Sequence, residues 1–219
     1  HINLWLVGDT IVDTGIGDER TRSLWEEVLG ERKISRVILT HYHPDHAGNA
    51  AWLTKKFGVQ LWTTQGEYLT APPVRPSSAG YTSEAVIDVF LKNGLEPERA
   101  AKMLGRTNRY AALVPDFPTS YRRIIHGDRL QIGGHEWRAF IGHGHAPEHL
   151  SLYCEALNVV IAGDMLLSTI STNVSVWSID PEGDPLRLFL ESLKRYLELP
   201  EDVLVLPSHG KPFRGAHAR

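Results

Sequence analysis

Apolar residues in the first third of the chain alternate between short runs and positions spaced as on one face of a helix. Short runs predict four strands, at residues 2–7, 10–13, 36–39 and 59–63. Helical spacing predicts a helix from Asp18, a capping residue, to about Gly30, and a second helix over 47–57 that Gly58 ends. This alternation of strand and helix is typical of a layered α/β or α+β fold.

The middle of the chain follows another pattern. Residues 71–78 contain three prolines and are predicted to be irregular, and helical patterns follow at 83–93 and 96–105. We therefore interpret residues 65–122 as a helical insert. Beyond it the pattern predicts an amphipathic helix at 184–197 and five strands, at residues 129–132, 137–141, 150–154, 159–162 and 203–206.

Composition narrows the classes of partner. The 219 residues carry a formal net charge of −3, so no basic field predicts a nucleic-acid or anionic-membrane partner. No apolar run approaches the roughly 18 to 20 residues that span a bilayer. Cys154 is the single cysteine, which excludes an intrachain disulfide and favours a cytoplasmic location. We expect a small-molecule substrate, and a homodimer is one open option. Because the chain begins inside a predicted strand, we expect its natural N-terminus to lie upstream.

A dense group of metal-binding residue types lies between a predicted strand and a predicted helix. It reads His41-Tyr42-His43-Pro44-Asp45-His46. In an extended stretch His41 and His43 lie on the same side, and the bend at Pro44 lets Asp45 and His46 face a second point. Imidazole and carboxylate ligands suit zinc, with iron or manganese as alternatives. Grouping four such side chains is costly unless a cation compensates.

Three further segments offer ligands at the ends of predicted strands. Asp164 follows the strand at 159–162, and His209 follows the strand at 203–206. Residues 142–149 contain His143, His145 and His149, and their spacing alone does not choose among them. Clustering of side chains at strand ends is typical of active sites in α/β folds.

Together these segments resemble the metallo-β-lactamase superfamily, and within it the branch of glyoxalase II-like hydrolases and lactonases. The resemblance rests on His-x-His-x-Asp-His at 41–46, Gly-His-x-Pro at 144–147, Gly163-Asp164, His209-Gly210 and Asp13-Thr14-Gly15. It implies one cation held by His41, His43 and His145, and another held by Asp45, His46 and His209. It also implies that Asp164 bridges the two cations and that Asp13 supports the ligands from behind.

The same resemblance implies a four-layer αβ/βα sandwich over residues 1–219, with the helical insert at about 65–122 over the metal edge. It implies two divalent cations, preferably zinc, and a metal-bound hydroxide that attacks a small carbonyl substrate, with Asp45 and Asp164 as catalytic residues. Thioesters are favoured over lactones and β-lactams. An iron-dependent sulfur oxidoreductase and, less favoured, a nuclease are the alternatives. The chain has no Gly-x-Ser-x-Gly elbow, which disfavours serine hydrolysis.

Several residues near the motifs have open roles. His149 is interpreted as a support for a ligand, His143 as a substrate or proton-transfer residue, and Tyr42 and Trp177 as substrate contacts or packing residues. Two positions depart from the branch: Gly142-His143 replaces its usual Thr-Pro, and Glu148 replaces its usual Gly.

The insert suggests the shape of the substrate. Its aromatic residues form either a small core or an apolar pocket, and they are Tyr68, Tyr81, Phe90, Tyr110, Phe117 and Tyr121. Its arginines are either surface charges or partners of an anionic group, and they are Arg75, Arg106, Arg109, Arg122 and Arg123. We predict a substrate with an apolar acyl part and an anionic remainder, such as a coenzyme A or glutathione thioester.

Overall fold

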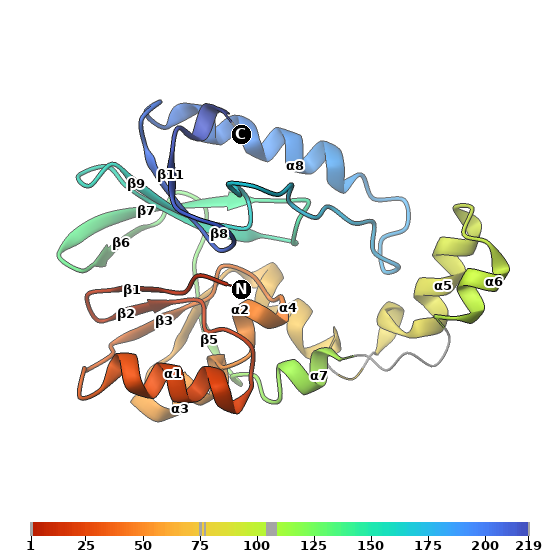
Figure 1. Cartoon of the computed structure of the whole chain (residues 1–219), viewed down its shortest axis with the longest axis horizontal. Coiled ribbons are helices and arrows are strands. Elements are labelled where there is room, and N and C mark those ends of the chain that lie inside the picture. Colours follow the sequence, from red (N-terminus) through yellow and green to blue (C-terminus); the bar gives the residue numbers. More distant parts are fainter. Residues whose placement is uncertain (1, 75, 77, 104–108, 219) are drawn as a thin grey trace.

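Two β-sheets pack face to face in the computed structural model, which describes residues 2–74, 76, 78–103 and 109–218 (Figure 1). The first sheet has the order β1 (Trp5–Val7), β2 (Thr10–Val12), β3 (Arg36–Ile38), β4 (Leu61–Thr63) and β5 (Tyr121–Arg123). The second has the order β11 (Phe213–Arg214), β10 (Leu204–Pro207), β9 (Val159–Gly163), β8 (His149–Cys154), β7 (His135–Gly142) and β6 (Arg129–Ile132). Strands β2 to β5 are parallel, and β9 is parallel to β10.

Helices cover the outer faces of both sheets. Helices α1 (Glu19–Leu29) and α3 (Ala50–Phe57) lie on the first sheet, and α8 (Pro185–Leu193), continued by the 3-10 helix η2 (Lys194–Glu198), lies on the second (Figure 1). The layers are therefore helix, sheet, sheet and helix, so the predicted αβ/βα sandwich is confirmed. None of the helices in the described ranges is long and apolar enough to cross a membrane.

The helix boundaries follow the capping signals of the sequence. The Asp18 carboxylate accepts a hydrogen bond from the Thr21 N–H (2.8 Å) at the start of α1. Gly58, with φ at 64°, ends α3 in the left-handed conformation that glycine adopts most readily. The helix predicted over 47–57 is instead two helices, α2 (Pro44–Ala47) and α3, because the chain turns at Gly48.

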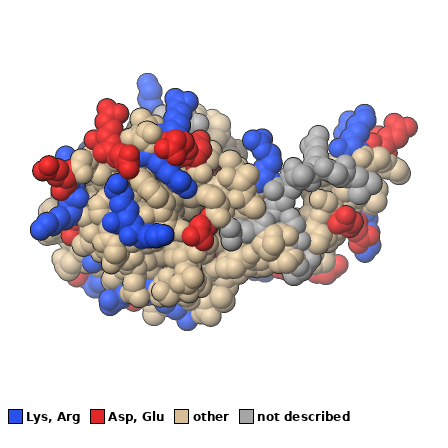
Figure 2. Space-filling view, turned by 90° about the horizontal axis from the view of Figure 1, so that it is seen from below, with Lys and Arg blue, Asp and Glu red and all other residues tan. Residues whose placement is uncertain are grey.

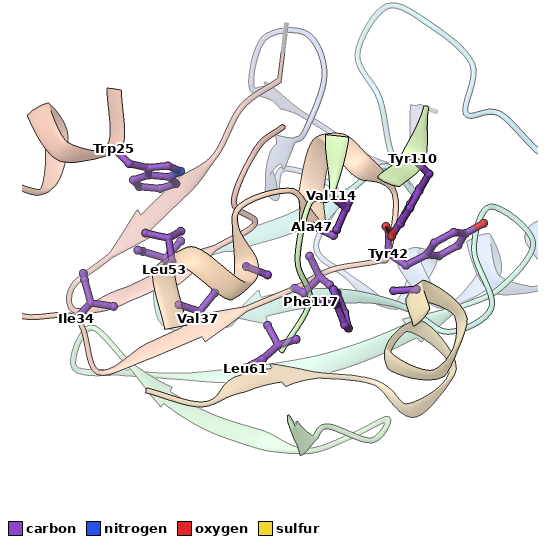
Figure 3. Packing of buried hydrophobic residues seen from close by; sticks show 14 of the residues in the cluster. Trp25, Ile34, Val37, Tyr42, Ala47, Leu53, Leu61, Tyr110, Val114 and Phe117 are labelled. Atoms are coloured by element: carbon purple, nitrogen blue, oxygen red, sulfur yellow. Dashed lines mark hydrogen bonds between the residues drawn. The ribbon is translucent and has the colours of Figure 1, made fainter. Parts of the chain in front are cut away.

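Three apolar clusters fill the spaces between the layers. Figure 3 shows the cluster between the first sheet and its helices, which includes Trp25, Leu53, Val37 and Leu61. A second cluster lies between the two sheets, and a third lies under α8 and η2 around Phe189. Helix α1 buries Trp25 and Leu29 in the first cluster, whereas Leu24 and Val28 of the same helix remain exposed.

Most of the predicted insert is helical: α4 (Gln65–Val74), the 3-10 helix η1 (Ala79–Tyr81), α5 (Ser83–Lys92), α6 (Pro97–Ala101) and α7 (Tyr110–Leu113). Its last two residues belong to β5, the edge strand of the first sheet. Helices α5 and α6 project away from the sandwich (Figure 1).

The irregular structure predicted for 71–78 is wrong for its first four residues, because α4 continues through Pro72 and Pro73 to Val74. Both prolines stand in the last turn, where their fixed φ is compatible with a helix but neither supplies an N–H for a helical hydrogen bond, and α4 ends one residue later.

The aromatic residues of this segment divide into two groups. Tyr68, Tyr110, Phe117 and Tyr121 join the apolar cluster of the first sheet, and Tyr68 stacks on Tyr121 with ring centroids 4.0 Å apart. Most of the predicted substrate aromatics therefore form core. Tyr81, in contrast, faces Trp177 from 6.4 Å.

Those arginines of the segment that the structure describes gather at no common point. Arg122 stacks on Trp62 in the first sheet with its guanidinium carbon 4.3 Å from the ring centroid, while Arg109 and Arg123 are exposed. Arg75 and Arg106 lie outside the described residues.

The cluster between the sheets predicts a large effect of truncation. Leu152 on β8 is fully buried, so Leu152→Ala should lower the free energy of unfolding by about 3 kcal/mol, through lost burial and the cavity left behind. Leu157→Ala, in the exposed β8–β9 turn, is the matched control and should cost less than about 0.5 kcal/mol. Urea denaturation measures both, and equal losses would show that the intersheet cluster does not stabilise the fold as described.

Candidate metal centre

The predicted ligands gather at one edge of the sandwich, because each of them follows a strand that ends there. The loop at 40–46 follows β3, the 143–148 turn joins β7 to β8, Asp164 follows β9 directly, and Ser208-His209 follows β10. Strands of both sheets thus deliver side chains to the same point, although the ligands are spread over almost 170 residues of sequence.

The first group of ligand atoms consists of three histidines. The His41 Nε2 lies 3.0 Å from the His43 Nδ1 and 3.1 Å from the His145 Nε2. His41 and His145 are buried, and His43 is partly exposed. One nitrogen from each ring lies within 4.8 Å of the others, which is the spacing that a shared cation requires.

The second group consists of Asp45, His46 and His209. The Asp45 Oδ2 lies 3.2 Å from the His209 Nε2 and 3.7 Å from the His46 Nε2. His46 is fully buried, whereas the side chains of Asp45 and His209 keep 31% and 24% of their exposure. This group is therefore the more open of the two.

Asp164 lies between the two groups. Its Oδ2 is 3.5 Å from the His145 Nε2 of the first group and 3.6 Å from the His209 Nε2 of the second, and its Oδ1 is 3.7 Å from the His46 Nε2. The His46 Nε2 and the Asp164 Oδ1 are buried and have no hydrogen-bond partner among the described residues. Buried polar atoms nearly always have a hydrogen-bonding or ionic partner, so the position of these two atoms is consistent with divalent cations as their partners.

Buried hydrogen bonds fix the orientation of the ligands. Asp13, with φ at 61°, accepts from the Thr40 N–H through Oδ1 (2.8 Å) and contacts the His46 Nδ1 through Oδ2 (2.8 Å). The Thr40 hydroxyl lies 3.0 Å from the His41 Nδ1, and the Asn173 carbonyl lies 2.7 Å from the His145 Nδ1. Such partners set which ring nitrogen faces the metal. Sequence reasoning identified Asp13 and missed Thr40 and Asn173.

The histidines of the first group are neutral at neutral pH. Burial and the neighbouring histidines hold the pKa of His41 well below its usual range. Burial, with His145 and His46 nearby, lowers the pKa of His43 to about 3, and burial also lowers the pKa of His145. Neutral imidazoles are the form that binds metals, so this group needs no loss of protons before a cation enters.

The second group holds protons. Burial opposes a charge on His46, but the charge of Asp13, the hydrogen bond to Asp13 and the nearby Asp164 carboxylate raise its pKa well above its usual range. The Asp164 and Asp45 carboxylates beside His209 raise the pKa of His209 to about 9.

The carboxylates of this group are ionised. Burial would raise the pKa of Asp45, yet the hydrogen bond to His209 and the charge of His46 lower it to about 2. Burial likewise opposes the charge of Asp164, and the nearby His209 and His46 hold its pKa well below its usual range. Carboxylates and protonated histidines therefore neutralise each other here.

The four remaining candidates take different positions. His149 is fully buried, and its Nε2 accepts from the Asp164 N–H (3.1 Å), so it supports the backbone of a ligand. Tyr42 is buried against the His43 ring rather than open to substrate. His143 has its Nδ1 2.7 Å from the Pro147 carbonyl and, with Trp177, lines a cavity of about 310 Å³. That cavity lies beside the ligand turn, so His143 and Trp177 remain candidates for substrate contact.

A sandwich of two sheets with a histidine- and aspartate-rich edge defines a class of metal-binding proteins, and comparisons with known proteins identify the family. The family model of the metallo-beta-lactamase superfamily matches residues 1–209, so the chain belongs to this superfamily, whose members are generally metal-dependent hydrolases.

Two solved structures resemble the whole chain. A beta-lactamase domain protein from Burkholderia ambifaria is 43% identical, with a TM-score of 0.86 over 100% of this chain and 67% of that one. A metallo-beta-lactamase family protein from Thermus thermophilus is 28% identical, with a TM-score of 0.78 over 100% of this chain and 71% of that one. The hydroxyacylglutathione hydrolase GloC of Haemophilus influenzae is 27% identical over 201 residues, which are 91% of this chain and 79% of that protein.

The difference in charge between the two groups predicts a difference in pH dependence. Below pH 9, a cation that enters the second group must displace the proton of His209, so its apparent affinity should rise by about tenfold per pH unit for each proton released. Binding to the neutral first group should change far less between pH 7 and 9. Calorimetric titration with Zn²⁺ in buffers of different ionisation enthalpy measures the protons released. Equal pH dependence of both binding events would contradict this description of the centre.

Proposed function

We propose that this chain is a hydrolase of small acyl compounds that uses two divalent cations, preferably zinc, and that thioesters are its preferred substrates. The observation that carries the proposal is the position of Asp164, whose carboxylate contacts histidines of both groups. A carboxylate in that position supports the binding of two cations rather than one. His41, His43 and His145 would hold the first, Asp45, His46 and His209 the second, and Asp164 would reach both.

A cation pair in this centre supplies Lewis acidity and lowers the pKa of water toward neutrality. The residues of the chain then set the geometry of the reaction. Asp164 is almost enclosed, with 10% of its side chain exposed, whereas Asp45 is more open at 31%. We assign proton transfer to Asp45: its carboxylate accepts the proton released when the water oxygen bonds to the carbonyl carbon. The bond between that carbon and the sulfur then breaks, and the thiolate leaves.

Two observations support a thioester with an apolar acyl part. The similarity to a hydroxyacylglutathione hydrolase favours thioesters over lactones and β-lactams. In addition, Trp177 borders two adjoining cavities. The cavity of about 310 Å³ reaches His143 and Pro147 beside the ligand turn, and one of about 520 Å³ extends to Phe90 on α5. These walls form a mostly apolar path from the ligand turn to the projecting helices, as small-molecule sites commonly do.

The alternative functions fit the molecule less well. An oxidoreductase that uses one iron needs only two histidines and an aspartate, whereas this chain brings together seven candidate ligands in three overlapping groups. A nuclease needs a basic surface. Figure 2 shows basic and acidic side chains interleaved on the face seen there, in keeping with the net charge of −3. Metal analysis of the purified protein, followed by assays on thioesters, lactones and a cephalosporin reporter with defined metals, tests the proposal against these alternatives.

Removing a metal ligand should lower the cation content while the chain stays folded. Asp164→Asn and His41→Ala should each lower the cation content and reduce hydrolysis by about 100-fold or more, because the reaction depends on the charge of the centre. Elemental analysis and circular dichroism report metal content and folding. Asp88→Asn, an exposed carboxylate on α5, is the control and should change neither. Full activity of the Asp164→Asn variant after chelation would refute the proposed chemistry.

The apolar path should select the acyl group. Phe90→Ala should raise KM for thioesters with a long apolar acyl chain by about tenfold, since burial of a phenyl ring contributes about 1.5 to 3 kcal/mol, while kcat changes little. Leu91→Ala is the matched control: Leu91 is the next residue of α5 and equally exposed, and it is not among the side chains that border this cavity. Acetyl and long-chain thioesters that lose activity in parallel would show that the path does not bind the acyl chain.

A further inference from the structure

Glu67 is a fully buried carboxylate that takes no part in the proposed chemistry. It is the third residue of α4, and its hydrogen bonds come from main-chain N–H groups rather than from a cationic side chain. A carboxylate without a charged partner is costly to bury, and it persists only where its oxygens accept strong hydrogen bonds. The identity of its partners therefore indicates what it does.

The two oxygens of Glu67 join the two loops that supply the first group of ligands. Its Oε2 accepts from the Tyr42 N–H (2.9 Å), and Tyr42 stands between His41 and His43. Its Oε1 accepts from the Glu148 N–H (2.6 Å), in the turn that carries His145. One side chain thus holds together segments that are more than 100 residues apart in sequence.

The backbone of Tyr42 is held on both sides. Glu67 accepts from its N–H, and the Tyr110 hydroxyl of α7 donates to its carbonyl (2.5 Å). One group of each peptide that flanks Tyr42 is therefore engaged, and the Tyr42 ring is buried, so the neighbouring His41 and His43 have little freedom to turn.

Glu148 completes the connection in the opposite direction. Its own carboxylate accepts from the Gly66 N–H (2.8 Å), one of the N–H groups that the first turn of α4 leaves without a helical partner. Its carbonyl accepts from the Thr64 hydroxyl (2.7 Å). The contact is close, since a Cβ on Gly66 would lie 2.9 Å from the Glu148 Cγ. Glu148 thus connects the start of α4 to the turn, and the Glu in place of the family's usual Gly has a structural role.

We propose that Glu67 and Glu148 are positioning residues that clamp the 41–43 loop and the 144–148 turn against α4 and thereby fix the spacing of His41, His43 and His145. The clamp contacts neither Asp45 nor His209 through any of these bonds, so its effect is specific to the first group. The inference rests on the proposed metal centre, but it is independent of which acyl compound is hydrolysed.

The variant Glu67→Gln tests the clamp at nearly constant volume. An amide presents an NH₂ group where one carboxylate oxygen stood, so one of the two N–H groups loses its acceptor. Zn²⁺ affinity is measured by competition with a chromophoric chelator in two backgrounds. His209→Ala leaves the first group complete, and His43→Ala leaves the second group complete.

We expect Glu67→Gln to weaken Zn²⁺ binding by about 10- to 100-fold in the His209→Ala background and by less than about threefold in the His43→Ala background. The visible spectrum of the Co²⁺-loaded protein should shift in the first background only, because the ligand geometry changes there. Glu84→Gln, an exposed carboxylate in the first turn of α5, is the matched control and should leave both affinities unchanged.

Two results would overturn the clamp: unchanged affinity at the first group, or equal losses at both groups together with a lower melting temperature. The second result would assign Glu67 to general stability. If Glu67→Gln does not fold, Glu148→Ala decides, since it removes the carboxylate that accepts from the Gly66 N–H, keeps both main-chain bonds of residue 148, and should still weaken the first group selectively. Failure of the parent chain to bind Zn²⁺ at all would refute the proposed function instead, so the two failures are distinguishable.

Discussion

The burial of charged and polar side chains at one edge of the sandwich is the constraint on which the rest of the molecule depends. His41, His46 and Asp13 are fully buried, and Asp164 is nearly so. Each such group loses its hydration, and that loss must be offset by hydrogen bonds or by charge of opposite sign. The offset comes from short contacts such as the one between Asp13 and His46. These contacts need exact side-chain directions, and the surrounding strands and apolar clusters supply the rigidity for them.

The two groups of ligands solve this problem in different ways. The first group avoids charge, because burial keeps its histidines neutral. The second group pairs charges, with protonated His46 and His209 against Asp45 and Asp164. The protons on His46 and His209 supply the positive charge that a cation would otherwise supply. A dication there would take the place of this positive charge, whereas a dication in the first group would bind imidazoles that are already neutral. The folded chain is therefore organised for cations before any cation arrives.

How far the sequence predicts this arrangement depends on how local each signal is. The caps at Asp18 and Gly58 act within a few residues, so the start of α1 and the end of α3 are predicted correctly. The ligand histidines carry a motif, and the structure brings them together. Thr40, Glu67 and Asn173 carry no local pattern, because their roles arise from partners elsewhere in the fold. Glu67 lies 81 residues from Glu148, and only tertiary structure makes that contact visible. The predicted insert included the first two residues of β5 for the same reason, because only the pairing of β5 with β4 identifies it as a strand.

The same distinction explains why the chemistry of this protein is easier to infer than its substrate. The ligands and their supports are buried and held by hydrogen bonds between fixed atoms, so their geometry limits the reactions they can perform. The side chains that border the two cavities are different. Trp177, Phe90 and Ile179 are exposed, and they lie on a loop and on a helix that projects from the sandwich. The loop and the projecting segment meet through a few contacts, such as the Ser178 hydroxyl that donates to the Gly80 carbonyl. Such a surface can change its shape without disturbing the buried centre. The side chains that border the cavities are thus separated from the buried ligands in the architecture itself, and α4 is the element where the two meet, because it begins the projecting segment and also contacts the ligand loops.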